Sequence, residues 1–198
     1  MDFTVQHEHT RKRVCIRLDI RIELPSTSTL DSLKVMVTNN NVVVEKNMKF
    51  RTSLALTTAN GNIVLYNTTA ASLSLDSIEG NIFGRVHQLE NSFQASTLNG
   101  NIDFVIASIS QRKDNAVMVK ASVSSGGIDI QLPETFDSQF DLRSGLNTPS
   151  AMFVRKDKET HTEAMGDPRH IRGYYGGNTN NMVKLSTVSG NVSLAYSM

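Results

Sequence analysis

The stretch Thr97-Leu98-Asn99-Gly100-Asn101-Ile102-Asp103-Phe104 decides the fold, because close copies of it recur along the chain. In each copy a hydroxyl residue precedes a glycine by three positions, and an asparagine followed by Ile or Val comes directly after the glycine. The other copies are found at residues 58–65, 77–84 and 187–194. A turn that recurs with the same flanking pattern indicates a repeat architecture.

The glycine of each copy serves as a phase marker for the residues around it. Apolar or small hydroxyl residues stand seven, five and three positions before the marker, and mostly apolar ones two and four positions after it. The same template fits two sites where Asn replaces Gly, which we attribute to the tolerance of Asn for a left-handed backbone. The predicted structural turn residues are Asn40, Gly61, Gly80, Gly100, Gly126, Asn147 and Gly190.

Two architectures explain this pattern. Asn-Gly between alternating apolar runs is a strong signal for a β-hairpin, which would give an antiparallel meander. However, the residue after the marker is Asn in five of the seven repeats, and a hairpin gives no reason for that. Stacked coils explain the repeated Asn, since asparagines in a column can form a side-chain hydrogen-bond ladder.

We therefore predict an all-β fold, a single-stranded right-handed parallel β-solenoid with about seven to eight coils of ~20 residues. The solenoid repeat domain spans residues 30–198, and residues 1–29 form an N-terminal arm with a capping strand. The capping strand is predicted from strict apolar alternation between Val14 and Leu24. Residues 155–181 lack the repeat and are predicted to form a degenerate coil with one long loop.

The amino-acid composition argues against several classes of function. The net charge of +1 at pH 7 argues against a nucleic-acid partner, which usually requires a basic excess. No apolar run is long enough for a transmembrane segment, and no signal peptide is visible. Cys15 is the only cysteine, and the histidines lack the spacing of a known metal site. The sequence also lacks a glycine-rich phosphate-binding loop. We therefore expect no metal and no cofactor.

The column of residues three positions after each marker points outward and contains two aspartates. Asp103 and Asp129 would lie on adjacent coils, with carboxylates about 5 Å apart. Retaining glycosidases use a carboxylate pair at that separation, and the repulsion between the two charges would raise one pKa. We interpret the pair as two solvated aspartates, with a catalytic pair in a polysaccharide-cleaving enzyme as the alternative.

The same column begins with apolar residues. Val43, Val64 and Phe83, with Tyr66 beside them, are predicted to form an outward apolar strip on three neighbouring coils. A contiguous apolar surface often marks an interaction site. The alternative is that the N-terminal strand or a loop covers it.

The repeated unit Thr/Ser-x-Asn/Ser-Gly-Asn-Ile/Val-x-Leu resembles the adhesin family of β-solenoid proteins found in bacteria and fungi. The resemblance rests on residues 58–65, 97–104 and 187–194, and residues 166–174 resemble the long loop before the last coil of fungal members. It covers about residues 30–198 and is specific for the fold more than for a function. It implies a cell-surface or extracellular location, and it supplies no catalytic residues.

Three functions follow from these observations. The leading one is a non-enzymatic structural or adhesin-like solenoid that binds an unknown protein or glycan through its sheet faces or its long loop. The second is the polysaccharide-cleaving enzyme that uses Asp103 and Asp129. The third is a scaffold that self-associates end to end, since the ends of a solenoid present unpaired strand edges.

Overall fold

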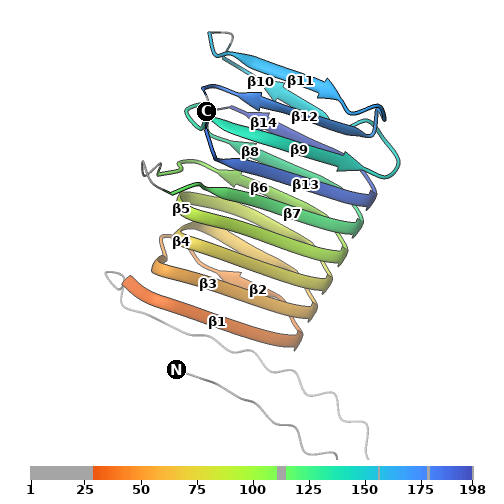
Figure 1. Cartoon of the computed structure of the whole chain (residues 1–198). Coiled ribbons are helices and arrows are strands. Elements are labelled where there is room, and N and C mark those ends of the chain that lie inside the picture. Colours follow the sequence, from red (N-terminus) through yellow and green to blue (C-terminus); the bar gives the residue numbers. More distant parts are fainter. Residues whose placement is uncertain (1–28, 111–114, 156, 178, 198) are drawn as a thin grey trace, which may run out of the picture.

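The computed structural model describes residues 29–110, 115–155, 157–177 and 179–197. Within these residues the fold is all-β, as predicted, with fourteen strands in one curled sheet around a continuous apolar core (Figure 1). The predicted N-terminal capping strand lies outside the described residues. The strands are β1 (Thr29–Asn39), β2 (Val42–Val44), β3 (Lys49–Asn60), β4 (Ile63–Glu79), β5 (Ile82–Asn99), β6 (Ile102–Ile106), β7 (Met118–Ser125), β8 (Ile128–Leu132), β9 (Ser138–Ser144), β10 (Ser150–Phe153), β11 (Thr160–Ala164), β12 (His170–Tyr175), β13 (Met182–Ser189) and β14 (Val192–Tyr196).

The chain crosses two sides of the molecule in turn, and we call one crossing of both sides a rung. The first side contains β1, β3, the later parts of β4 and β5, β7, β13 and β9. The second contains β2, the beginnings of β4 and β5, β6, β8, β14 and β10. All these strands pair in parallel, and most partners are one repeat apart, so that Leu54 pairs with Leu73 and Leu73 pairs with Phe93. The partners of β13 and β14 lie 43 or 64 residues away in the chain.

The phase template predicts the core well. In the repeats around Gly61, Gly100, Gly126 and Gly190, every position that the template assigns to the interior is buried. Around Gly100, for example, Phe93 and Phe104 have no exposed surface, and their rings lie 5.0 Å apart. The repeat motif therefore specifies a column of apolar side chains between the two sides.

The marker glycines are required because successive rungs approach closely at the turn. Gly126 has a φ of +137°, and a Cβ added to it would lie 2.0 Å from the carbonyl oxygen of Gly100. The other marker glycines stand in the same relation to the marker of an adjacent rung in the stack, as Gly61 does to Asn40 and Gly190 to Gly126. Asn40 and Asn147 do not have a positive φ, so the left-handed backbone that we predicted for them is wrong. In the described chain no rung precedes Asn40, so no earlier marker carbonyl approaches it there.

The hydroxyl residue three positions before the marker also has a structural role. Its side chain is buried and donates a hydrogen bond to the carbonyl oxygen of the marker in the adjacent rung of the stack. Thr58 bonds Asn40 at 3.0 Å, Thr97 bonds Gly80 at 3.0 Å, and Ser144 bonds Gly190 at 2.7 Å. The motif thus satisfies a carbonyl that the turn leaves without another partner in the ladder.

Replacing Thr97 by Val tests this role, because the change keeps the shape and removes the hydroxyl. We expect Thr97→Val to lower the free energy of unfolding by about 1–2 kcal/mol, since a buried carbonyl loses its donor. Thr68 is the matched control, because its buried hydroxyl has no hydrogen-bond partner among the described residues. Urea denaturation should show Thr68→Val to be neutral or stabilising, and equal losses for the two variants would contradict the assignment.

The asparagines after the markers form a different ladder from the one predicted. Their side-chain oxygens accept hydrogen bonds from backbone N–H groups of the next rung, as from Asn62 to Asn41 at 2.8 Å and from Asn81 to Asn62 at 2.8 Å. These bonds run from backbone to side chain and not between two side chains, and the positions lie at the outer corner of the turn. The sequence therefore indicated the column correctly but not its chemistry.

The order of the rungs is the main departure from the prediction. The C-terminal rung, β13 and β14, does not follow β9 and β10 in the stack but lies between them and β7 and β8. The buried Asn181 fixes its beginning, since its side chain accepts a bond from the N–H of Val117 and donates one to the carbonyl of Asp137. The side-chain amide of Asn181 thus forms hydrogen bonds to the chain on both sides of the inserted C-terminal rung.

The region predicted to be a long loop contains a hairpin instead. β11 and β12 pair antiparallel, and β12 pairs antiparallel with β9, so the hairpin extends the first side at one end of the stack (Figure 1). Beneath it, the rings of Phe140, Phe153, Tyr175 and Tyr196 pack together with centroid distances between 4.2 and 5.9 Å. The hydroxyls of Ser138 and Tyr196 are 2.6 Å apart within this cluster. These aromatic rings close the apolar core at the hairpin end.

Candidate functional site

The outer surface of the first side near the hairpin carries most of the polar chemistry. Strands β7, β13, β9, β12 and β11 lie next to one another there, and their outward residues align in columns because the registers are continuous. We call this surface the capped face. Its central column is Lys120, Lys184, Asp141, Arg172 and Glu163, and its flanking columns are Met118, Met182, Gln139, Tyr174 and His161 on one side and Ser122, Ser186, Arg143 and His170 on the other.

Asp141 is the centre of an ionic cluster on the capped face. Oδ1 accepts a bond from Nε of Arg143 at 3.0 Å and lies 3.0 Å from Nε2 of His170. Oδ2 accepts bonds from Arg172 at 2.8 Å and from Arg143 at 3.3 Å. Burial alone would raise the pKa of Asp141, but the hydrogen bonds from Arg143 and Arg172 outweigh it and lower the pKa to about 2.

Asp141→Asn should reveal this cluster in the pH dependence of stability. A carboxylate whose pKa falls on folding stabilises the folded state above its ordinary pKa, and the gain disappears as the pH falls through the folded value. We expect the variant to lose on the order of 1–2 kcal/mol at neutral pH, and this difference from wild type to vanish between about pH 4 and pH 2. Denaturation at several pH values measures it, and a difference that is constant with pH would contradict the role of the charge.

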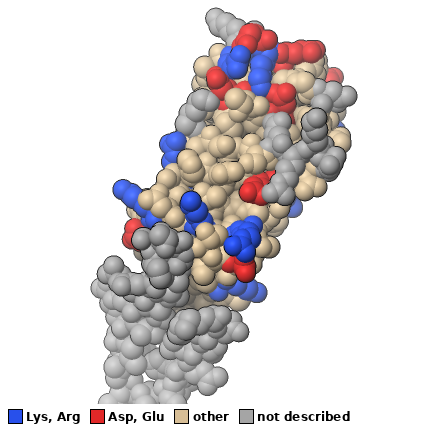
Figure 2. All heavy atoms as spheres, turned by 90° about the vertical axis from the view of Figure 1, so that its left-hand side faces the viewer, with Lys and Arg blue, Asp and Glu red and all other residues tan. Residues whose placement is uncertain are grey.

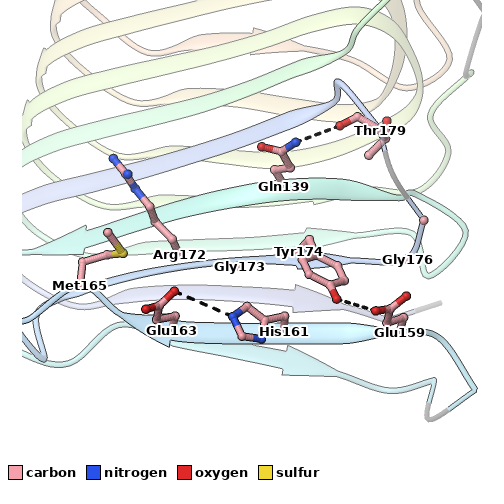
Figure 3. A pocket seen from close by; sticks show the side chains of 11 residues that line it. Gln139, Glu159, His161, Glu163, Met165, Arg172, Gly173, Tyr174, Gly176 and Thr179 are labelled. Atoms are coloured by element: carbon pink, nitrogen blue, oxygen red, sulfur yellow. Dashed lines mark hydrogen bonds and ion pairs between the residues drawn. The ribbon is translucent and has the colours of Figure 1, made fainter.

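A cavity of about 560 Å³ opens at the hairpin end of the capped face (Figure 3). Its aromatic wall is Tyr174, whose ring stacks on His161 with a centroid distance of 5.7 Å. Polar groups surround this pair, and Gln139 is held in place by a 3.1 Å bond to the carbonyl of Thr179. The charged side chains that line the cavity are Glu159, Glu163 and Arg172.

Hydrogen bonding fixes the position of the aromatic wall. The hydroxyl of Tyr174 donates to Oε1 of Glu159 at 2.6 Å, and this bond raises the pKa of the tyrosine above its ordinary value. Nε2 of His161 lies 3.9 Å from Oε2 of Glu163. The described residues include no group of three or more His, Cys, Asp or Glu side chains that could hold a metal ion. The site offers instead an aromatic face with hydrogen-bonding groups around it.

The predicted aspartate pair is brought together as expected. Asp103 in β6 and Asp129 in β8 are direct partners on neighbouring parallel strands, and both are exposed. Burial and, after it, the charge of Asp129 raise the pKa of Asp103. The next residues of the column are Ser193 and then Ser150, the reverse of the predicted order, because the C-terminal rung is inserted. The pair lies on the second side, away from the cavity.

The predicted apolar strip is only partly exposed. Val43, Phe83 and Tyr66 expose 48%, 38% and 45% of their surface, but Val64 exposes only 6%. Val64 lies in register between Val43 and Phe83. The strip therefore consists of separate apolar side chains.

Charged side chains of both signs gather at the hairpin end of the molecule, with uncharged residues below them (Figure 2).

Sequence reasoning missed the capped face for two reasons. Residues 155–181 carry no repeat, so nothing placed His161, Arg172 and Tyr174 beside β9. The phase template does place Lys120, Asp141 and Lys184 in one column, but stacking in chain order would put Asp141 between the two lysines. The inserted rung makes the lysines direct neighbours instead.

The fold and the site define an all-β repeat protein whose stack ends in a polar, hairpin-covered face. The profile of the family described as Toastrack DUF4097 matches residues 7–195, so the chain belongs to this family, a β-rich family of unknown function. A search of curated proteins gave no match, and neither did a search of solved structures. The described residues contain no helix that is long and apolar enough to cross a membrane.

Proposed function

We propose that the protein is a non-enzymatic, adhesin-like β-solenoid that binds a glycan at the capped face. In this proposal the coils are right-handed, the usual hand of parallel crossovers, and number about seven to eight. The parallel registers and the family membership support the solenoid. A cell-surface or extracellular location would suit such a protein and is part of the proposal.

The observation that carries the proposal is the cavity with the Tyr174 and His161 pair. Binding sites for small polar ligands combine aromatic surface with a few fixed hydrogen-bonding groups. A sugar ring presents C–H groups that pack on an aromatic face and hydroxyls that bond to amides and carboxylates at its edge. Gln139, Glu159 and Glu163 supply these groups around the aromatic pair.

A glycan array followed by calorimetric titration tests this proposal. We expect Tyr174→Ala to reduce the affinity for every bound glycan at least about tenfold, since one stacked ring contributes on the order of 1.4 kcal/mol or more. Tyr66→Ala is the matched control, because Tyr66 is an exposed tyrosine on the second side. Absence of any bound glycan, or equal affinities for the two variants, would overturn the proposal.

The second candidate function is polysaccharide cleavage by Asp103 and Asp129. It is favoured by their direct register and by the raised pKa of Asp103, which a general acid requires. A reducing-sugar assay over a panel of polysaccharides, with wild type and Asp103→Asn, tests it. Release of sugar by wild type but not by the variant would establish cleavage. We expect no release by either, and a variant of unchanged or slightly higher stability, because the repulsion is removed.

End-to-end self-association is a weaker alternative. Among the described strands, β11 and β10 each have one unpaired edge at the hairpin end. The side chains of β11 are all exposed and include His161 and Glu163, and charged side chains on an edge strand oppose stacking. Light scattering at two protein concentrations tests this alternative. A monomeric mass at both concentrations would exclude a self-associating scaffold.

A further inference from the structure

Two lysines on the capped face lie side by side, and neither forms an ion pair with a described residue. Lys120 in β7 and Lys184 in β13 are direct partners in a parallel register, about 4.8 Å apart along the stack. Both are exposed, and neither forms an ion pair or side-chain hydrogen bond with a described residue. Like charges at directly opposed positions of a sheet are destabilising. We call these two residues the lysine pair.

The nearest carboxylate does not neutralise the lysine pair. Asp141 is the next residue of the column and the partner of Lys184 in β9. Both of its oxygens are already bonded, to Arg143 and His170 through Oδ1 and to Arg172 and Arg143 through Oδ2. Asp141 is therefore shared among other cations, and the centre of the capped face keeps a positive excess.

We propose that the lysine pair binds the acidic group of an anionic glycan whose neighbouring ring packs on Tyr174. This inference rests on the proposed function, because the same glycan occupies the cavity. Tyr174 and Lys184 belong to β12 and β13, which are separated only by β9. Their backbones are separated by two strand spacings and by two residues along the strand, about 12 Å in all, which is on the scale of two to three linked sugar rings.

The chemistry of the surface favours an acidic glycan over a nucleic acid. The residues beside the lysine pair are Ser122, Ser186 and Gln94, which are hydrogen-bonding groups rather than further cations. The chain as a whole has a net charge of only +1. One short row of positive charge next to an aromatic cavity fits a ligand with isolated carboxylates or sulfate esters, and it does not follow a phosphate backbone.

Calorimetric titration of the full chain with three oligosaccharides of equal length tests the inference. The probes are a neutral glucan, a uronic acid oligomer and a sulfated oligomer, so that carboxylate and sulfate are distinguished. We expect an acidic probe to bind more tightly than the neutral one, and Lys120→Gln with Lys184→Gln to weaken that acidic probe about tenfold or more. The binding of the neutral probe should not change.

Lys34→Gln is the matched control for the double variant. Lys34 is exposed, lies on the same side at the same phase of the repeat, and pairs with the uncharged Ala55. Acidic probes that bind no tighter than the neutral one, or that bind the double variant as tightly as Lys34→Gln, would overturn the inference. If Tyr174→Ala abolishes binding of all probes while the double variant changes none, the proposed function stands and the lysine pair has no part in it. If the double variant loses an acidic probe that Tyr174→Ala retains, the aromatic cavity is not the site.

Discussion

A chain that ends at Gly177 is expected to lose cooperative folding. The deleted C-terminal rung buries five apolar side chains almost completely, Val183, Leu185, Val192, Leu194 and Tyr196. At about 1.5–3 kcal/mol for each side chain, the loss is comparable with the entire stability of a typical domain. Because the rung lies between two others, its removal also separates β7 from β9 and β8 from β10.

Thermal unfolding followed by circular dichroism measures the effect of the truncation. The outcome differs from that for a terminal repeat, whose deletion removes only its own contacts and one interface. Within the same strand, Leu185→Ala should cost about 2–5 kcal/mol, whereas the exposed Val188→Ala should change stability by less than about 0.5 kcal/mol. A truncated chain that still melts in one sharp transition near the wild-type temperature would show that the rung is dispensable.

Gly126→Ala is expected to destabilise the protein by more than about 3 kcal/mol. The added methyl group would lie 2.0 Å from the carbonyl oxygen of Gly100, at a φ of +137°. Relief requires the rungs of Gly100 and Gly126 to move apart, which would break hydrogen bonds between them such as the one from the N–H of Gly100 to the carbonyl of Ser125 at 3.0 Å. Neither backbone can yield without opening the ladder.

The adjacent glycine provides the control for this substitution. A methyl group at Gly127 would be 3.6 Å from its nearest neighbours, the ordinary contact distance, so Gly127→Ala should change stability by no more than about 1 kcal/mol. Urea denaturation of the two variants gives the comparison. Similar midpoints for both would mean that the turn tolerates a side chain and that the glycine column has another cause.

The sequence predicted the fold where the chemistry of a rung is local. The glycine, the hydroxyl residue before it and the alternating apolar residues each act within one rung or on its immediate neighbour, so their spacing is visible in the chain. Asp103 and Asp129 were placed side by side for the same reason, since their rungs are consecutive in both sequence and space.

The order of the rungs was not predictable from the repeat. Every rung presents the same phase to its neighbours, so the repeat pattern alone is compatible with β13 beyond β9 or between β7 and β9. The decisive groups lie outside the repeat, in the buried amide of Asn181 and in the hairpin of β11 and β12. The same ambiguity hid the lysine pair, because chain order would separate Lys120 from Lys184 by Asp141.

The capped face depends on the position of β13 between β7 and β9, and an engineered disulfide tests that position directly. In a Cys15→Ser background, Ser122→Cys with Ser186→Cys joins direct partners about 4.8 Å apart, within the range of a disulfide. Ser122→Cys with Arg143→Cys joins residues two strands apart, about 10 Å, which no disulfide spans. After mild oxidation of the folded protein, we expect the first pair to cross-link and the second to stay reduced. Cross-linking of the second pair and not the first would show that the rungs stack in chain order and would contradict the account.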